Sequence, residues 1–323
     1  MGQILVAIDT DCGLTGYGVG GGGLAGMHVV RTVLRDLLLD REPEPIEQIW
    51  DLMYRTTLAF GRKGIAIMAI SGVDLALWDL RGKAAAAPVA ELLGGRTGQP
   101  MPTYSTVWDD ITPAEARMHS AFKLHVENRS GHDSVAAVVS AVQNARDILG
   151  ADKPLMLDAW MKWDISTTLA VAQAVEDLNI DWIEEPIPAD DLAGYEQLVA
   201  ECPISIAGGE HEFTAAAFGE LIDRRLHHIL QPDVCWCGGM TELVKIYNMV
   251  NAAGLRVCPH RGSEIWSLHA LAALDPQPLA ESGRPWMTWV GGQPPIKNGS
   301  ITLGDSPGLG VTIDEGHLPG CIT

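Results

Sequence analysis

Basic residues are scarce in this chain of 323 residues, which has 22 lysines and arginines against 41 aspartates and glutamates. The formal net charge of -19 repels phosphate backbones and anionic lipid headgroups, so we expect neither nucleic acid nor a membrane as a partner. An anionic small substrate would meet the same repulsion unless a bound divalent cation reversed the field locally. The acidic excess therefore directs attention to a metal site.

Long apolar runs and a dense cysteine framework are also absent. No stretch approaches the roughly 18 residues that cross a bilayer, and the run Ala84–Ala87 ends at Pro88. The six cysteines are scattered from Cys12 to Cys321 and no signal-peptide pattern precedes them, so we expect a protein of the reducing cytoplasm. Apolar residues make up 47% of the chain and charged residues 20%, as in a globular protein with one large core.

Two kinds of pattern divide the chain. Residues 1–95 combine an alternating strand pattern at Ile4–Asp9, a glycine-rich turn and helical patterns, which predicts a small α+β unit. From about Tyr104, short apolar strands alternate with amphipathic helices, as in βα units around a parallel sheet. We expect these strands at Met101–Ser105, Phe122–Val126, Leu155–Asp158, Trp182–Glu184, Ile204–Ala207, His228–Gln231, Arg256–Pro259 and Pro278–Glu281.

Eight parallel strands at this spacing favour a closed (β/α) barrel over an open doubly wound sheet. The predicted helices between the strands include Ser134–Leu149, Thr167–Leu178 and Thr241–Ala253. The tail after Pro285 has strand and turn chemistry and is expected to return to the first unit. We therefore predict a barrel over residues 100–285 and a cap over residues 1–95 that residues 286–323 complete.

Acidic residues stand at the C-terminal ends of the predicted strands, where ligands bind in barrels. Asp158, Glu184 and Glu210 follow one another at intervals of 26 residues, about one βα unit each. Three carboxylates on neighbouring strand ends would repel one another, whereas Mg²⁺ takes carboxylate and water ligands in an octahedral arrangement. We interpret the three as a magnesium site, although any one of them could instead cap the helix after its strand.

A histidine and an aspartate are predicted on adjacent strand ends, because His260 follows Asp233 by 27 residues. Such a dyad would fix the imidazole tautomer and raise its basicity, so that His260 can accept a proton near neutral pH. Glu281 ends the last predicted strand. A histidine after a proline is more often structural, and the position on the barrel face is what favours a catalytic role.

Several motifs resemble the enolase superfamily, in its mandelate racemase/muconate lactonizing branch. They are FGRKGIAIMAISGVDLALWDLRGK, LMLDAWM, WIEEPIPADD, GGEHEFT, LQPDVCWCGGMTELVKI and VCPHRGSEIWSLH, and the resemblance extends over nearly the whole chain. The combination is most similar to acid-sugar dehydratases of the L-rhamnonate dehydratase type. The resemblance implies an α/β fold, a modified (β/α) TIM barrel with an α+β capping domain. It also implies a Mg²⁺ cofactor, a small-molecule sugar acid as substrate and a homo-oligomer.

The resemblance further implies roles for individual residues. The matched positions are Asp158, Glu184 and Glu210 as metal ligands, His260 as the base with Asp233 beside it, Glu281 as the support of a substrate carboxylate or enolate oxygen, and His211 as a substrate contact. Lys123 is expected as a catalytic cation that supports the substrate carboxylate, with His125 as a substrate contact beside it; the alternative is a barrel-interior lysine neutralised by the acidic cluster. Arg62 is expected to contact the polyol, although a basic residue in a loop is ordinarily solvated. The implied reaction removes the C2 proton of a sugar acid such as L-rhamnonate and eliminates the C3 hydroxyl, giving a 2-keto-3-deoxy sugar acid.

Two departures from the family pattern concern specificity. The Lys-x-Lys pair of many relatives is Lys123-Leu124-His125 here, so a base on the opposite face, which a racemase needs, stays open. Relatives have a further strand before ILVAIDT and a fuller βα unit between Ser105 and Phe122. We therefore expect the part of the cap that selects the sugar to be abbreviated.

Other functions were weighed against the same residues. The pattern G-x-G-x-x-G at Gly18–Gly23 follows a strand, but no acidic residue about twenty positions later ends a second strand, which disfavours a dinucleotide site. Cys235, Cys237 and Cys258 lack paired C-x-x-C spacing, which favours core cysteines over zinc ligands. A racemase or epimerase of the same family, or a barrel that binds a sugar acid without converting it, remains as an alternative.

Overall fold

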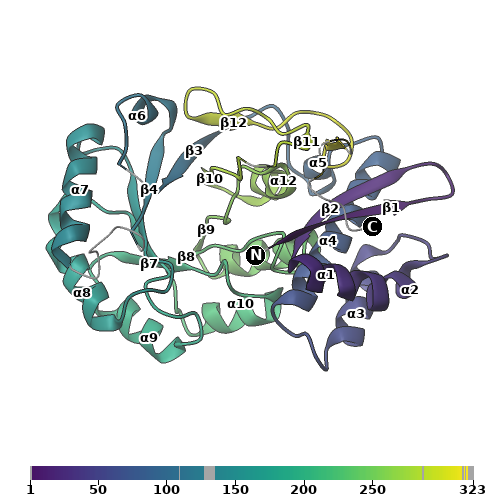
Figure 1. Ribbon diagram of the computed structural model, residues 1–323, viewed down its shortest axis with the longest axis horizontal. Helices are drawn as coiled ribbons and strands as arrows, with labels where there is room; N and C mark the ends of the chain where they lie inside the picture. The colour runs from purple at the N-terminus through teal and green to yellow at the C-terminus, as the bar shows by residue number, and fades with distance from the viewer. Residues whose placement is uncertain are drawn as a thin grey trace.

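A computed structural model describes residues 2–108, 110–126, 135–285, 287–314, 316 and 318 of the chain. A ring of strands with helices outside it fills one side of the molecule, and a smaller unit lies beside it (Figure 1). Ser134 and Cys321, which were named above, lie outside the described residues. Among the described residues, no helix has both the length and the apolar character needed to cross a membrane.

Two antiparallel strands and a long helix organise the N-terminal unit. Gln3–Asp9 forms β1 and Thr15–Gly21 forms β2. The other elements of this unit are α1 (Gly23–Val29), η1 (Val30–Leu34), α2 (Arg35–Leu38), α3 (Ile46–Thr57), α4 (Ile65–Ala84) and α5 (Val89–Leu92). Helix α4 is buried along most of its length, because the two strands, α3 and the barrel helix α11 (Met240–Ala252) pack around it.

The glycine-rich segment that was predicted as a turn is strand β2, so that prediction is wrong. Gly16, Gly18 and Gly20 face α4, and a Cβ on Gly18 would lie 2.1 Å from the carbonyl oxygen of Gly72. Only glycine lets the strand approach the helix backbone this closely. The G-x-G-x-x-G pattern therefore serves strand-to-helix packing, which leaves no space for a dinucleotide at Gly18 and Gly20.

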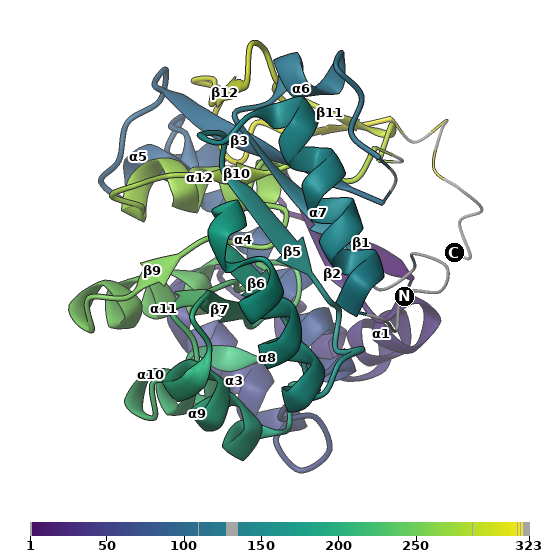
Figure 2. The same ribbon diagram turned by 90° about the vertical axis from the view of Figure 1, so that its left-hand side faces the viewer.

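Eight parallel strands form the barrel in sequence order (Figures 1 and 2). They are β3 (Pro100–Val107), β4 (Ala121–His125), β5 (Leu155–Asp158), β6 (Trp182–Glu184), β7 (Ser205–Gly208), β8 (Ile229–Leu230), β9 (Arg256–Val257) and β10 (Ala280–Glu281). Strand β10 pairs with β3, where Ala280 lies opposite Thr103, so the sheet turns back on itself. The predicted TIM barrel is confirmed, and each strand overlaps one predicted segment.

Helices cover the outside of the barrel (Figure 2). Besides α11 they are α6 (Glu115–Met118), α7 (Val135–Leu149), α8 (Ile165–Ala174), α9 (Leu192–Glu201), α10 (Thr214–Asp223) and α12 (Ile265–Leu274). The four residues of α6 confirm that the unit between β3 and β4 is short. The helix predicted at Thr167–Leu178 begins earlier, because Asp164 accepts a hydrogen bond from the backbone N–H of Thr167 at 2.7 Å, and it ends in the 3-10 turn Glu176–Leu178.

The C-terminal tail contacts both parts of the fold. It contains β11 (Val290–Gly291), β12 (Ser300–Thr302) and β13 (Thr312–Ile313), and β12 pairs antiparallel with β3. The backbone N–H of Val89 donates to the carbonyl of Gly308 at 2.9 Å, and the N–H of Leu309 donates to Asp79 Oδ1 at 2.8 Å. These contacts lie on elements of the N-terminal unit. The division into residues 1–95 with 286–323, and residues 100–285, stays a prediction.

Side chains of α3 and α4 hold the N-terminal unit against the barrel. Trp50 Nε1 donates to the carbonyl of Gly238 at 2.8 Å. Asp74 accepts hydrogen bonds from the backbone N–H of Thr241 at 3.0 Å and from its hydroxyl at 2.6 Å. Because Thr241 lies in the first turn of α11, the Asp74 carboxylate caps that helix from the neighbouring unit. Burial raises the pKa of Asp74 to about 7.

We expect Gly18→Ala to destabilise the protein by about 1–3 kcal/mol, because its Cβ would meet the backbone of α4, which cannot move aside without repacking. Thermal and urea denaturation measure the change. Gly304→Ala is the matched control, since a Cβ at Gly304 meets no atom within 4 Å. A Gly18→Ala protein as stable as the Gly304→Ala control would show that β2 and α4 are not packed this closely.

We expect Asp74 to make the protein less stable as the pH rises from about 4 to about 7. Its folded-state pKa of about 7 lies above that of an unfolded aspartate, so the neutral acid stabilises the fold at low pH and this contribution is lost as the pH rises through the folded value. Asp74→Asn should flatten the pH dependence of the free energy of unfolding, and Asp36→Asn, on the exposed surface, should not. Equal slopes for wild type and Asp74→Asn would contradict this assignment.

Candidate active site

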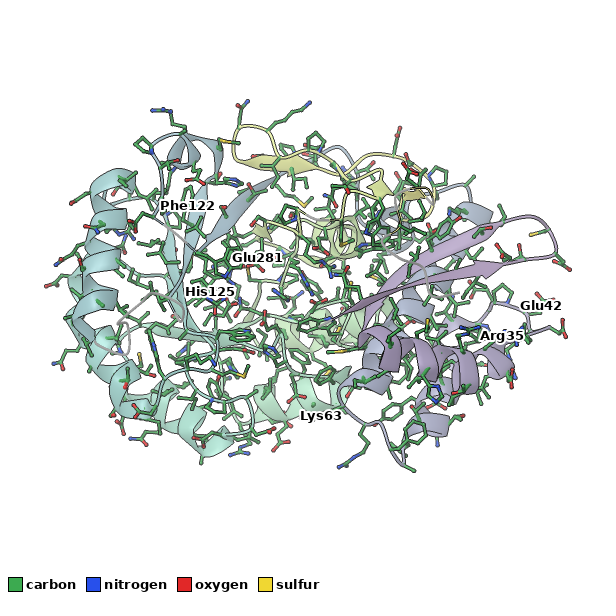
Figure 3. All side chains as sticks on the ribbon, viewed as in Figure 1. Arg35, Glu42, Lys63, Phe122, His125 and Glu281 are labelled. Carbon is green, nitrogen blue, oxygen red and sulfur yellow. The ribbon has the colours of Figure 1, made fainter. Side chains whose placement is uncertain are left out.

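A cavity of about 770 Å³ opens at the C-terminal ends of the barrel strands. Its walls include the predicted site residues Lys123, His125, Asp158, Glu210, His260 and Glu281. His125 and Glu281 lie inside the ring of helices, whereas Lys63 lies at the periphery (Figure 3). Glu184 and Asp233 do not line the cavity, but each contacts a residue that does.

Lys123 lies among three carboxylates and is 1% exposed. Its Nζ is 2.5 Å from Glu184 Oε1, 2.9 Å from Glu281 Oε1 and 3.3 Å from Asp158 Oδ2. Burial opposes the charged ammonium, but the carboxylates of Glu184, Glu281 and Asp158 raise the pKa of Lys123 well above its usual value. A single buried ammonium therefore lies against three carboxylates and cannot neutralise them all, so this part of the site has a net negative charge.

His260 lies between two carboxylates. Its Nδ1 is 3.0 Å from Asp233 Oδ2 and its Nε2 is 2.9 Å from Glu210 Oε2. Burial opposes protonation, but the charge of Glu210 and the hydrogen bonds to both carboxylates raise the pKa of His260 to about 10. A carboxylate oxygen lies within hydrogen-bonding distance of each ring nitrogen, which favours the imidazolium form of His260. It can accept a proton only when Nε2 has lost its own and is released from Glu210.

The carboxylates fit a hard divalent cation by donor chemistry and position. Asp158 and Glu184 lie opposite each other at the ends of β5 and β6, and Glu210 follows β7. Burial, together with repulsion from neighbouring carboxylates, raises the pKa of Asp158 to about 6 and that of Glu184 to about 8, so Lys123 alone does not neutralise them. Mg²⁺ accepts oxygen donors of this kind. Here Asp158 and Glu184 are turned to Lys123 and Glu210 to His260, and a metal would have to compete with these protein cations.

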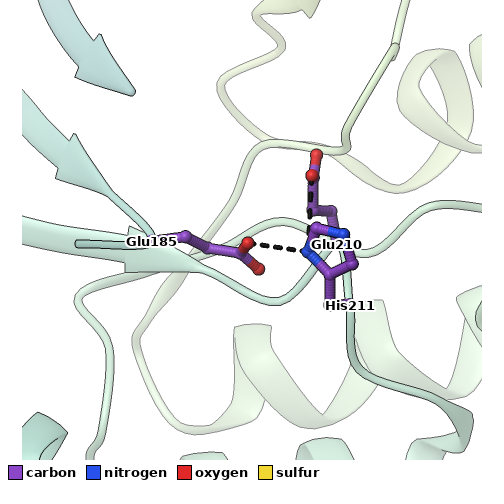
Figure 4. A group of neighbouring side chains, drawn as sticks. All are labelled: Glu185, Glu210 and His211. Carbon is purple, nitrogen blue, oxygen red and sulfur yellow. Dashed lines mark hydrogen bonds and ion pairs between the residues drawn. The ribbon is translucent and has the colours of Figure 1, made fainter. Parts of the chain in front are cut away.

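Glu210 also belongs to a second group of side chains, of which the sequence analysis had named Glu210 and His211 but not Glu185. Among the described residues, the group whose donor atoms all lie within 4.8 Å of one another is Glu185, Glu210 and His211 (Figure 4). His211 Nδ1 is 2.7 Å from Glu185 Oε2 and 3.4 Å from Glu210 Oε1. Glu185 is the second glutamate of WIEEP, and its left-handed backbone, with φ of 37°, turns the chain directly after β6.

The remaining predicted contacts lie at the edges of the cavity. The His125 ring stacks on Trp108 with centroids 5.4 Å apart, and its Nε2 is 3.6 Å from Asp158 Oδ2. His211 packs against Trp236, which lines the cavity. Arg62 is exposed and is not among the lining residues. The structure thus brings every predicted residue except Arg62 to the cavity or against its walls, and the role of each residue stays a prediction.

Cys235, Cys237 and Cys258 are interior residues in the described structure, and no metal-binding group found there includes them. Cys235 accepts a hydrogen bond from Arg284 Nη2 at 3.9 Å, and Cys258 contacts the hydroxyl of Tyr104 at 3.9 Å, so they belong to different contacts in the interior. Burial raises the pKa of both thiols to about 12, which disfavours the thiolate that zinc requires. Within the described residues, no group with metal-ligand spacing contains a cysteine.

Sequence reasoning missed several residues that shape the cavity. Three tryptophans, Trp108, Trp160 and Trp236, line it together with Lys162 and Arg261. In the sequence, each of them comes a few residues after a strand end or a predicted site residue. A single sequence does not show whether such a residue lines the cavity or packs in the core. Below the cavity, Gln231 Nε2 donates to Glu184 Oε2 at 2.6 Å and fixes that carboxylate, although LQPD had been noted only for its aspartate.

Comparison with known proteins defines the class as α/β-barrel proteins with a capping domain. Residues 2–94 match the model of the mandelate racemase/muconate lactonizing enzyme N-terminal domain, and residues 111–317 match the model described as enolase C-terminal domain-like. The chain therefore belongs to the enolase superfamily, in its mandelate racemase/muconate lactonizing enzyme branch.

Solved structures with related sequences extend over almost the whole chain. A racemase from Streptomyces coelicolor A3(2) with bound magnesium is 32% identical over 98% of this chain and 90% of its own, with a TM-score of 0.89. L-rhamnonate dehydratase from Gibberella zeae is 32% identical over 98% of this chain and 84% of its own, with a TM-score of 0.90. L-talarate dehydratase from Polaromonas sp. JS666, complexed with Mg and L-glucarate, is 29% identical over 97% of this chain and 90% of its own, with a TM-score of 0.87.

We expect Lys123→Met to destabilise the metal-free protein by about 3–5 kcal/mol, because three buried carboxylates lose their shared cation. MgCl₂ should then raise the melting temperature of the variant more than that of the wild type, since the cation supplies the missing charge. Thermal denaturation in EDTA and in MgCl₂ measures both effects. Lys162→Met is the matched control: Lys162 also lines the cavity, but its described contact is with the Trp160 ring. A Lys123→Met protein with wild-type stability in EDTA would refute the ion cluster.

Proposed function

We propose that this protein is a Mg²⁺-dependent acid-sugar dehydratase. The observation that carries the proposal is the His260–Asp233 dyad, which faces a proposed metal carboxylate, Glu210, at the wall of the cavity. A base beside a metal site is the arrangement that removes a proton next to a carboxylate. The similarity to L-rhamnonate and L-talarate dehydratases supports this reaction class.

The proposed metal site comprises Asp158, Glu184 and Glu210. A bound Mg²⁺ would stabilise the negative charge that develops on the substrate carboxylate as the C2 proton leaves. Two of these carboxylates are fixed by hydrogen bonds, because the backbone N–H of Trp160 donates to Asp158 Oδ1 at 3.1 Å and Gln231 Nε2 donates to Glu184 Oε2 at 2.6 Å. Their orientation is therefore set before a ligand arrives.

His260 would move the proton through Nε2. Nδ1 stays bonded to Asp233, which fixes the ring and the tautomer, while neutral Nε2 takes the C2 proton of the sugar acid. The resulting imidazolium gives that proton to the departing C3 hydroxyl, so water leaves and the enol product rearranges to a 2-keto-3-deoxy acid. One residue acts as base and then as acid in the elimination, and the enol then becomes the keto acid by taking a proton from solvent at C3 and releasing its hydroxyl proton to solvent.

Lys123 and Glu281 would bind the acid end of the substrate from the other side of the site. The Lys123 ammonium supplies positive charge for a carboxylate oxygen, and Glu281 is held by the Thr106 hydroxyl at 2.5 Å and by the backbone N–H of Arg261 at 2.7 Å. His125 borders the same part of the cavity. We propose substrate contacts for His125 and His211 as well, whereas the exposed Arg62 lies outside the cavity lining and is not part of this proposal.

A racemase or epimerase is the second candidate. The similarity to a racemase from Streptomyces coelicolor favours it, and Lys123 with His125 lies on β4, away from the strand that precedes His260. Incubation in D₂O separates the two reactions. A racemase exchanges the C2 hydrogen without loss of water, whereas a dehydratase forms a 2-keto acid.

The first substrate to test is L-rhamnonate, followed by L-lyxonate and L-mannonate. A library of sugar acids with MgCl₂, analysed for 2-keto product, tests the function directly. If no sugar acid forms a keto acid or exchanges its C2 hydrogen, a barrel that only binds its ligand becomes the better account. A cytoplasmic homo-oligomer stays a prediction from the sequence.

We expect His260→Asn to lower kcat for keto-acid formation by about 10²–10⁴-fold, because the general base is removed. Binding of the sugar acid, measured by calorimetry with MgCl₂, should persist. His28→Asn, on the exposed face of α1, should leave both unchanged. A His260→Asn enzyme whose kcat stays within tenfold of the wild type would rule out His260 as the base.

A further inference from the structure

Arg261 follows the proposed base directly, lines the cavity and has φ of 52°. This left-handed conformation is unusual for a long side chain, and residues held in it gather at functional sites. Here it lets one residue reach two other strand ends. The backbone N–H donates to Glu281 Oε2 at 2.7 Å, and the guanidinium Nη2 donates to Asp233 Oδ2.

Arg261 and His260 share the same oxygen of Asp233. His260 Nδ1 is 3.0 Å from Oδ2, and the other oxygen accepts the backbone N–H of Cys235 at 2.7 Å. Although burial favours the neutral acid, the charges of Arg261 and His260 hold the pKa of Asp233 well below its usual range. The carboxylate that orients the base is therefore itself oriented by Arg261.

The plane of the guanidinium is fixed beside the base by an aromatic ring. Arg261 Cζ lies 4.9 Å from the centroid of Trp236, and the same ring lies 5.6 Å from the imidazole of His260. A guanidinium stacked in this way keeps its fork of N–H donors in one orientation. Trp236 thus sets the positions of both His260 and Arg261 relative to the cavity.

One donor of the guanidinium has no partner among the residues that the structure describes. Arg261 Nε is buried and has no hydrogen-bond partner within the part of the chain that the structure describes. A buried donor without an acceptor is unfavourable, so such a group calls for a ligand oxygen. Arg284, the other arginine in the cavity wall, differs, because its Nε and Nη2 both donate to Glu264.

We propose that Arg261 is a substrate-binding and positioning residue of this site. Its guanidinium donates to an oxygen of the sugar acid, a hydroxyl or carboxylate near the carbon that His260 deprotonates, while its other contacts hold Asp233 and Glu281 in place. The proposal rests on the proposed function, because it requires an acid ligand with oxygens at adjacent carbons.

Arg261→Lys and Arg261→Ala test the two parts of this role. Lysine keeps the positive charge near Asp233 but lacks Nε and the planar fork, so KM for the sugar acid should rise by roughly ten- to hundredfold, with a smaller change in kcat. Alanine removes both contacts, so kcat should fall as well. Guanidinium chloride at low concentration should partly restore turnover by Arg261→Ala, and urea, which has the same shape without the charge, should not.

The controls separate binding from folding. Arg224→Ala, on the protein surface, should change neither KM nor kcat and should show no rescue. If Arg261 has only a structural role, both substitutions should lower the melting temperature and leave KM within twofold of the wild-type value. That result would overturn this inference but not the proposed function. Calorimetry of the wild type with the sugar acids and MgCl₂ tests the proposed function itself. If the wild type neither binds nor converts any sugar acid, the proposed function and this inference are both wrong.

Discussion

The active site depends on the compensation of buried negative charge. Four carboxylates at the C-terminal ends of the strands, Asp158, Glu184, Glu210 and Glu281, are kept from water by the barrel, and Lys123 and His260 compensate part of their charge. A barrel core this acidic would be unstable without cations, yet the raised pKa values of Asp158 and Glu184 show that the compensation is incomplete. The same imbalance that costs stability suits the site to a divalent cation.

The N-terminal unit is coupled to this site through close backbone packing. Strand β2 contacts α4 through glycines, and a Cβ at Gly21 would lie 3.1 Å from Trp236 Nε1. Trp236 in turn lies against His260 and Arg261. The N-terminal unit therefore supports the cavity wall beside His260, the proposed base, while Asp74 fixes this unit to α11. Folding of the cap and preorganisation of the site are parts of one packing arrangement.

The relatives combine dehydration and racemisation on one scaffold, and the structure suggests why small changes could select between them. Both reactions begin with loss of the proton next to a carboxylate, and they differ in what donates a proton afterwards. His260 and Lys123 reach the cavity from different strands. If the proposed function holds, we expect specificity for one sugar acid to depend on wall residues such as Trp108 and Arg261 rather than on the proposed metal carboxylates.

The sequence by itself determined the barrel, its strand positions and the neighbouring ends of β5 and β6. The reason is that the length of a βα unit fixes the strand end at which each carboxylate lies. The register that pairs Asp158 with Glu184 agrees with this spacing. Only the tertiary structure decided that the glycine run is a strand and that Lys123 shares three carboxylates. It likewise decided that Arg261 joins Asp233 to Glu281. Spacing along the chain determines at which strand end a residue lies. The contacts of its side chain depend on local backbone turns, such as the left-handed one at Arg261, and on charged residues of distant strands that are buried in the same place.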